Sequence, residues 1–298
     1  MSKTIAGGTA ASGGLYPLYW MRVYNSKRVP PMRRVQFIEI LDQTWLPRSL
    51  RDATTDALQF IVNLGNLYKP IVPHLRNALE IARTHHVVDI CSGGGGPWLR
   101  LYQVFEEDEK FPVDIYLTDK YPNIGAFEHA RAVSQSKINF HASPTDATQI
   151  PSELKGFRTL FTSFHHFPPQ EARVILQNVV DTQQGIGIFE IARRHPLTIF
   201  LACLVPVVAL IVIPFMRPFR WSRLIWTYLI PIVPFVLLFD GVVSCIRTYS
   251  PQELAELTER LSANAYKWDI GEEMSGILPI PITYLIGCPT PKAQAGRK

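Results

Sequence analysis

Cysteine and charged side chains are scarce in this sequence of 298 residues. Its four cysteines are scattered along the chain, which excludes a disulfide-stapled scaffold and indicates a reducing compartment. Charged residues make up 18% of the chain, below the roughly 25% of typical soluble domains. Hydrophobic residues make up 47%, which excludes a disordered chain. The sequence contains no zinc-finger or RNA-recognition motif, so we expect no nucleic-acid partner.

The first 34 residues differ in composition from the rest of the chain. Residues 1–14 are rich in glycine, alanine and serine, which is typical of a disordered tail. The aromatic segment 15–21 is followed by basic residues with no acidic residue among them: Arg22, Lys27, Arg28, Arg33 and Arg34. This order is typical of a membrane-interface segment, although a strap packed on the domain or a solvated basic arm has the same composition. We therefore assign residues 1–34 to a flexible tail and a basic, aromatic arm.

Residues 35–195 divide into a helical part and an alternating part. The apolar spacing predicts a helical cap over 35–84, with a helix that starts at Asp52 or Thr54 and a break at Pro70 and Pro73. From residue 85 onward, strands are expected at 87–90, 113–117, 138–140, 159–164 and 185–191. Helices are expected between them at 98–107, 127–134 and 169–180. This alternation over 85–195 predicts a doubly wound, mostly parallel α/β sheet.

The chain returns to this pattern after an apolar insert at 196–246. Ser250, Pro251 and Glu253 form a capping box that opens another helix. Two strand-like runs follow, at 266–270 and 282–287. We therefore assign 247–298 to the same α/β core as 85–195.

The sharpest local signal is a glycine-rich segment between the first predicted strand and the helix after it. It reads Asp89-Ile90-Cys91-Ser92-Gly93-Gly94-Gly95-Gly96-Pro97. Glycines let a backbone approach a ligand closely, and a helix N-terminus supplies free amide donors. A P-loop is excluded because no Gly-Lys-Ser/Thr ending is present, and the dinucleotide fingerprint fits poorly in register, which weakens an NAD-dependent oxidoreductase. A tight turn without a ligand is the alternative, and the entropic cost of four consecutive glycines argues against it.

This segment resembles the first motif of the class I S-adenosylmethionine (SAM)-dependent methyltransferases. Their motif is an acidic residue followed by alternating glycines after the first strand, and Asp89, Gly93 and Gly95 match it. Cys91 stands where the family usually has its first glycine. The resemblance implies a Rossmann-like, seven-stranded sheet that binds SAM, with loop contacts to the cofactor from Asp89, Cys91, Ser92, Gly93 and Gly95.

Three later segments fall in the order that the resemblance requires. Asp119, followed by Lys120, ends the second strand, where the family has an acid that binds the ribose hydroxyls. Asp146-Ala147 follows the third strand, where the family meets the adenine. Ser163-Phe164-His165-His166 ends the fourth strand and is similar to the segment that lines the methyl-donor pocket. Ligands of open α/β sheets bind at the carboxyl ends of the strands, so these segments are expected to converge, although Asp119 as a turn residue and Asp146 as a helix cap are local alternatives.

A general base is needed only if the methyl acceptor is protonated at the working pH. His165 and His166 are the first candidates because histidine titrates near neutrality, with Glu190 at the end of the fifth strand as a second candidate. A purely structural histidine pair is the alternative. We predict no metal site, since His85 and His86 have no partner at ligand spacing.

The insert contains two uncharged runs. Residues 196–216 and 224–239 carry no charge, and the seven residues between them contain Arg217, Arg220 and Arg223. A bilayer span takes about 20 apolar residues, so the first run is long enough and the second is short. We favour a kinked helical hairpin that dips into one leaflet through 197–239, with its arginines, Trp221 and Trp226 near the headgroups. A hairpin that spans the bilayer is the second interpretation, and a soluble lid or dimer interface is the third.

Together these features predict a membrane-associated, SAM-dependent methyltransferase on the cytoplasmic side of a membrane. The expected acceptor is a lipophilic small molecule methylated on oxygen or nitrogen, with carbon as a further option. The N-terminal helices are expected to cover the cofactor or the acceptor. The alternative function is a SAM-binding membrane scaffold or regulator without methyl transfer.

Overall fold

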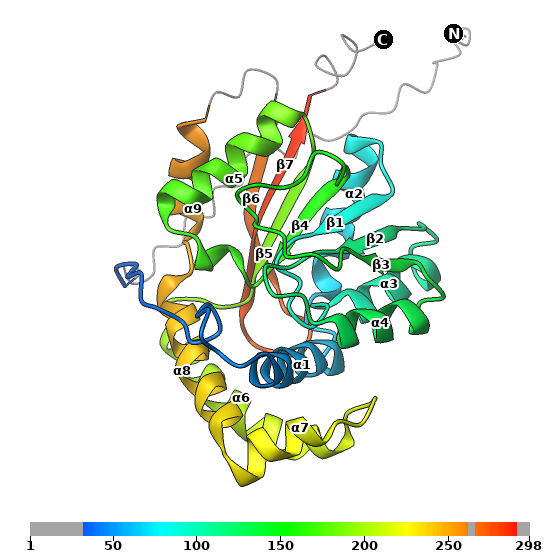
Figure 1. Ribbon diagram of the computed structural model, residues 1–298. Coiled ribbons are helices and arrows are strands. Elements are labelled where there is room, and N and C mark those ends of the chain that lie inside the picture. The colour runs from blue at the N-terminus through cyan, green and yellow to red at the C-terminus, as the bar shows by residue number, and fades with distance from the viewer. Residues whose placement is uncertain (1–31, 262–265, 291–298) are drawn as a thin grey trace, which may run out of the picture.

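The computed structural model describes residues 32–261 and 266–290, and within these ranges the core is one seven-stranded sheet in the order β3-β2-β1-β4-β5-β7-β6 (Figure 1). The strands are β1 (His86–Asp89), β2 (Asp114–Leu117), β3 (Ile138–Phe140), β4 (Phe157–Phe161), β5 (Ile186–Glu190), β6 (Tyr266–Met274) and β7 (Pro281–Pro289). Strands β1 to β5 are parallel, and β7 pairs antiparallel with both β5 and β6. This sheet confirms the α/β fold that the resemblance implies. The expected tail, and the arm up to residue 31, lie outside the described residues.

Helices cover both faces of the sheet because successive strand residues point to opposite sides. Val87 packs in one core and Val88 in the other. The first core is closed by helices α2 (Val72–Ala82), α3 (Trp98–Glu107) and α4 (Ile124–Val133). The second is closed by α5 (Pro169–Thr182) and α9 (Pro251–Glu259). The predicted capping box at the start of α9 is confirmed, with Ser250 Oγ accepting from Glu253 N and the Glu253 carboxylate accepting from Ser250 N.

Strand β4 ends earlier than the sequence pattern predicts. It stops at Phe161, and Thr162 adopts a left-handed conformation with φ 43°, which an extended strand does not accommodate. The following residues form a short 3-10 turn, η2 (Phe164–His166). The histidine pair therefore lies in a turn beyond the strand, at the edge where the other parallel strands β1, β2, β3 and β5 also end.

The prediction of a helical cap is wrong for residues 35–47, which contain no helix. Helix α1 (Arg48–Leu64) begins after Pro47, so the predicted starts at Asp52 and Thr54 are wrong as well. The reason is a partner from the insert, because the Asp240 carboxylate accepts hydrogen bonds from Ile40 N at 2.8 Å and Leu41 N at 2.9 Å. These backbone groups are satisfied by a distant side chain instead of by a helical turn.

The insert forms a bent helical hairpin that extends away from the sheet (Figure 1). It contains α6 (Pro196–Val212), η3 (Ile213–Phe215), α7 (Trp221–Leu224), the π-helical turn η4 (Ile225–Leu229) and α8 (Ile232–Arg247). Helices α6 and α8 pack against each other, and α1 lies across them. Within the described part of the chain, Pro196–Phe215 is the one helix long and apolar enough to cross a membrane, and the segment Trp221–Leu229 meets α8 at a bend of 79°.

Two of the three arginines between the apolar runs contact α1, whereas Arg217 is exposed. Arg223 Nε donates to Asp56 Oδ2 of α1 at 2.8 Å, and Arg220 Nη1 lies 3.3 Å from the same oxygen. The expected contact of Arg223 with lipid headgroups is therefore wrong, because its side chain is buried against the Asp56 carboxylate, whereas the placement of Arg217 and Arg220 stays a prediction. Trp221 keeps an exposed side chain, and Trp226 Nε1 donates to Ser49 Oγ of α1 at 3.1 Å.

Candidate functional site

The glycine loop between β1 and α3 is held in left-handed backbone conformations. Gly93, Gly95 and Gly96 have φ values of 54°, 104° and 53°. Cys91 also has a positive φ of 60°, although it carries a side chain. A non-glycine residue in this region costs about 1–2 kcal/mol, which explains why the resembled family usually has glycine at this position.

Helix α1 lies directly against the glycine loop. A Cβ atom at Gly94 would come within 2.7 Å of the carbonyl oxygen of Thr55, so only glycine permits this approach. Asn63 Nδ2 donates to Gly96 O at 2.8 Å, and Asn63 Oδ1 accepts from Arg100 N at 3.0 Å. The N-terminal helix thus shapes the loop from outside.

Asp89 supports the loop from behind. Its carboxylate accepts hydrogen bonds from Ser92 Oγ at 2.7 Å and Thr159 Oγ1 at 2.6 Å. Burial raises the pKa of Asp89 to about 6, although both hydroxyl donors oppose the shift. Asp89 therefore holds the loop in place, and its contact with the cofactor stays a prediction.

Asp119 follows β2 and faces the loop. Gly93 N donates to its Oδ2 at 2.7 Å and Tyr121 N donates to its Oδ1 at 2.7 Å. Burial raises the pKa of the Asp119 carboxyl. Each oxygen accepts one amide and keeps a lone pair, so the carboxylate has the capacity to accept two further donors.

Asp146 lies beyond β3 and is more accessible. Thr148 Oγ1 donates to Asp146 Oδ1 at 2.6 Å, and this hydrogen bond lowers the pKa of Asp146. Lys120 Nζ lies 3.7 Å from Asp146 Oδ2. The segments after β2 and β3 are thus joined across the site, as their position at one sheet edge predicts.

A cavity of about 910 Å³ opens at this edge of the sheet. Ten of the residues predicted from the sequence line it: Cys91, Ser92, Gly93, Asp119, Lys120, Asp146, Ala147, Ser163, His165 and His166. Four predicted residues do not line it: Asp89, Gly95, Phe164 and Glu190. Phe164 instead packs in the core against Tyr249, with the ring centroids 5.5 Å apart.

The same cavity continues between α1 and the hairpin. Its wall there is mostly apolar and comes from Leu58 and Ile61 of α1, Leu201 and Val205 of α6, and Val236 and Leu237 of α8. Helix α1 thus covers the cavity, and the expectation that the N-terminal helices cover the cofactor or the acceptor stays a prediction. One continuous space therefore connects the polar glycine loop with the apolar interior of the hairpin.

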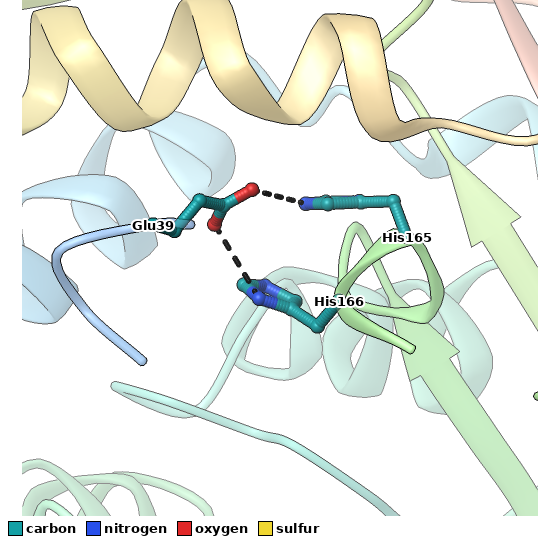
Figure 2. Close-up of side chains that lie close together, drawn as sticks. All are labelled: Glu39, His165 and His166. Carbon is teal, nitrogen blue, oxygen red and sulfur yellow. Dashed lines mark ion pairs between the residues drawn. The ribbon is translucent and has the colours of Figure 1, made fainter. Parts of the chain in front are cut away.

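His165 is enclosed between two carboxylates. Its Nδ1 lies 2.9 Å from Glu190 Oε2. On the other side, its Nε2 lies 3.5 Å from Glu39 Oε1, a contact that Figure 2 shows. His165 is 1% exposed, and its Nε2 has no hydrogen-bond partner among the described residues. Because Glu190 accepts the Nδ1 proton, the lone pair of a neutral imidazole remains on Nε2.

His166 stacks on His165, with the ring centroids 4.5 Å apart. Its Nδ1 lies 2.9 Å from Asp42 Oδ1 and 3.4 Å from Glu39 Oε2. Burial opposes the charged form of His166, but the Glu39 and Asp42 carboxylates outweigh it and raise the pKa to about 9. Burial likewise opposes the charge on Asp42, and the hydrogen bond from His166 lowers its pKa to about 2 nevertheless.

Two arginines brace the turn that carries the histidines. Arg247, the last residue of α8, donates to His166 O at 2.6 Å and to His165 O at 3.3 Å. Arg34 donates to Phe167 O at 3.2 Å. Arg247 Nη1 also lies 3.0 Å from Asp42 Oδ2, so the end of the insert, the N-terminal segment and η2 form one charged cluster.

Glu39, Asp42 and Arg247 were not identified from the sequence. Glu39 and Asp42 lie in the segment predicted as helix, and Arg247 lies at the end of the apolar insert. No motif spacing relates these positions to the histidines. The pattern visible at Glu39 and Asp42 is an acidic pair that follows the basic arm, and an ordinary polar surface segment has the same composition.

No protein-family model and no curated protein match the chain, whereas solved methyltransferase structures do. An O-methyltransferase family protein from Burkholderia thailandensis is 14% identical, with a TM-score of 0.46, and the match covers 80% of this chain and 59% of that one. Human N-acetylserotonin methyltransferase, solved in complex with SAM, is 13% identical with a TM-score of 0.45, and 80% and 56% of the two chains are covered.

A third similar structure is magnesium protoporphyrin IX methyltransferase from Synechocystis with bound S-adenosylhomocysteine (SAH). It is 12% identical with a TM-score of 0.42, and the match covers 76% of this chain and 84% of that one. This chain spans only 59% and 56% of the length of the first two proteins. Similarity at this level identifies neither a substrate nor a site residue of this chain.

Proposed function

We propose that this chain is a SAM-dependent methyltransferase that methylates a lipophilic small molecule at the cytoplasmic face of a membrane. The observation that carries the proposal is the continuous cavity, which has a nucleoside-binding set of donors and acceptors at one end and an apolar helical hairpin at the other. Its volume of about 910 Å³ is at the upper end of the roughly 300–1,000 Å³ of small-molecule sites.

The residues at the glycine loop fit the cofactor. The lone pairs left on Asp119 suit the two hydroxyls of a ribose, and the left-handed loop allows close backbone approach. Asp146 and Ala147 line the next part of the wall, where an adenine would lie. The Ser163 hydroxyl is buried without a hydrogen-bond partner among the described residues, so it is available to a ligand. When bound, SAM supplies an electrophilic methyl group.

His165 is the base that the geometry favours. Glu190 fixes the ring so that the Nε2 lone pair is free, and His165 lines the cavity. His166 is unsuited to this role because the carboxylates of Glu39 and Asp42 keep it protonated. In our proposal His165 Nε2 takes the proton of an acceptor hydroxyl or amine, whose oxygen or nitrogen would bond to the methyl carbon as the methyl–sulfur bond breaks and SAH is left. An acceptor with an acidic C–H group is the further option. Helix α1 and the hairpin would exclude water from the reacting atoms.

The outer face of the hairpin supports association with one leaflet of a membrane. Large apolar side chains are exposed along it: Leu197, Phe200, Leu204, Val207, Leu210, Ile211, Phe215, Phe219, Trp221, Ile225, Tyr228, Leu229, Ile230, Phe235, Leu238 and Phe239. Only 22% of the most apolar window of α6 and η3 is buried. Both ends of the insert return to the sheet, which keeps the cavity on one side of the bilayer. An exposed apolar surface of this extent is typical of a membrane or partner interface.

The first test is calorimetric titration of SAM, SAH and NAD into the detergent-solubilised chain. We expect micromolar binding of SAM and SAH and no binding of NAD. Transfer of a labelled methyl group to a panel of lipophilic alcohols, phenols and amines is then measured for the wild type, for His165→Gln and for the matched control His86→Gln. We expect His165→Gln to lower turnover with little change in SAM affinity, and His86→Gln to behave as wild type because its side chain is 71% exposed. SAM binding without transfer to any acceptor would favour the scaffold.

A further inference from the structure

Three side chains from distant parts of the sequence meet at the wall of the cavity. Figure 2 shows the Glu39 carboxylate facing the rings of His165 and His166, with one oxygen toward each ring. One ligand-capable atom of each side chain lies within 4.8 Å of the other two. Glu39 is 2% exposed, so its carboxylate is enclosed by protein and shielded from bulk water.

The contact between His165 and Glu39 is incomplete as it stands. In a neutral His165 whose Nδ1 proton is donated to Glu190, a lone pair is left on Nε2. That lone pair faces Glu39 Oε1 at 3.5 Å, and both groups are acceptors. Two buried acceptors repel each other unless a proton or a cation lies between them. A carboxylate behind the distal nitrogen of a histidine is also the usual outer support of a metal-bound imidazole.

We propose that Glu39, His165 and His166 bind one divalent transition-metal ion, for which Zn²⁺ is the natural probe. Two imidazole nitrogens and one carboxylate oxygen form a ligand set of catalytic zinc sites, which keep a fourth position open. Zinc–ligand bonds of about 2.0–2.1 Å place tetrahedral ligand atoms about 3.3 Å apart. His166 Nδ1 lies 3.4 Å from Glu39 Oε2, which is close to this value. His165 Nε2 lies 3.5 Å from the other oxygen, Oε1, so a small rotation of the carboxylate or the ring would bring all three ligands to one ion.

The carboxylates around the site favour a cation, which would displace the proton that Glu39 and Asp42 hold on His166, because an imidazole binds a metal only through a deprotonated nitrogen. Three carboxylates, from Glu39, Asp42 and Glu190, surround the imidazoles. They are opposed by the guanidinium groups of Arg247 and of Arg34, which donates to His165 O at 3.3 Å. Arg247 Nη1 lies 3.3 Å from Glu39 Oε1, and Ser244 Oγ donates to the same oxygen at 3.1 Å. Arg247 and Ser244 contact Oε1 of Glu39, so neither of them occupies Oε2. Both contacts hold the carboxylate in place, as outer hydrogen bonds do for metal-bound carboxylates.

The ion would lie where the cavity wall meets the acceptor. Glu39, His165 and His166 all line the cavity, so the open position faces it. A bound ion occupies the Nε2 lone pair of His165, and His165 is then a ligand instead of a base. The ion lowers the pKa of an acceptor hydroxyl coordinated at the open position, which makes the oxygen nucleophilic. The binding site itself does not depend on methyl transfer.

The test is titration of ZnCl₂ into untagged chain that has been freed of metal with a chelator. We expect one Zn²⁺ per chain and no competition from Mg²⁺, which prefers an all-oxygen ligand set. Glu39→Gln and His166→Asn are each expected to weaken Zn²⁺ binding by at least about tenfold. His86→Asn is the matched control, since His86 is exposed on β1 and should leave Zn²⁺ affinity unchanged.

X-ray absorption of the Zn²⁺-loaded wild type keeps the test independent of variants that fail to fold. We expect two imidazole nitrogens at about 2.0–2.1 Å. Sulfur ligation, fewer than two imidazoles, absence of stoichiometric Zn²⁺ binding, or affinity unchanged in both ligand variants would overturn the site. SAM titration of the same metal-free protein separates the two proposals. If SAM binds but no Zn²⁺ site is found, only the metal proposal is refuted. If Zn²⁺ binds but SAM does not, only the proposed cofactor is refuted.

Discussion

Asp56 of α1 joins the insert to the rest of the molecule, and its replacement by alanine is expected to be costly. Its carboxylate is 3% exposed and accepts hydrogen bonds from Arg223 Nε and Asn123 Nδ2, each at 2.8 Å. Asp56→Ala leaves the Arg223 guanidinium, itself 4% exposed, without a counter-charge. An uncompensated buried charge costs about 3–5 kcal/mol of unfolding free energy. For a chain of 298 residues, this loss corresponds to a fall in Tm of about 5–8 °C.

Thermal and urea unfolding in mild detergent, followed by tryptophan fluorescence, measures this loss. Trp226 donates to Ser49 of α1 and so reports the separation of the hairpin from that helix. Asp52→Ala is the matched control one turn earlier, because the Arg48–Asp52 pair is 3.7 Å apart and its arginine is exposed to solvent. That substitution should cost less than about 1 kcal/mol.

A second substitution tests whether the buried charge itself causes the loss. Arg223→Met in the Asp56→Ala background removes the stranded guanidinium and should restore most of the lost stability. If Asp56→Ala destabilises the protein no more than Asp52→Ala, Asp56 does not anchor the insert electrostatically. The same conclusion follows if Arg223→Met lowers the unfolding free energy further in the Asp56→Ala background.

Three further outcomes are expected. Asp119→Ala should weaken SAM binding in calorimetry by about tenfold or more, whereas Asp114→Ala at the other end of β2 should not; equal affinities would refute the ribose assignment. Phe200→Asp on the exposed face of α6 should weaken sedimentation with anionic vesicles by about tenfold, and the exposed off-hairpin control Ile277→Asp should leave it unchanged. Burial raises the pKa of Asp89 from 3.8 to about 6, so its stabilisation is present below about pH 4 and is lost as the pH rises through 6. The unfolding free energy of wild type relative to Asp89→Asn should therefore fall by about 2 kcal/mol from pH 4 to 7, and a constant difference would contradict this.

The core of the fold could be predicted because its signals are local. Val87 and Val88 alternate between two apolar faces, and the helix after the glycine loop, Trp98–Glu107, has the predicted bounds. The capping box at Ser250 could likewise be predicted, since its partner Glu253 lies within one turn. Such features depend on residues a few positions apart, so the sequence pattern contains them.

The segment 35–47 shows why other parts could not be predicted. Its apolar spacing favours a helix, but hydrogen bonds from Ile40 and Leu41 to Asp240 hold it in a non-helical path. Arg223 shows the same limit, because composition placed it at a membrane surface and Asp56 of α1 draws it inward. In both cases a charged partner far away in the sequence outweighs the local tendency.

The residue pattern was enough to predict the alternation of strands and helices, the glycine loop with its acidic neighbours, and an apolar insert after the fifth strand. The meeting of Glu39 with His165 and His166, and the continuation of the cavity from the loop into the hairpin, became visible only in the folded chain. This difference arises because periodicity and turn chemistry are short-range properties of the chain. A shared cavity and a buried charge cluster arise only when the packing of distant elements excludes water from the groups between them.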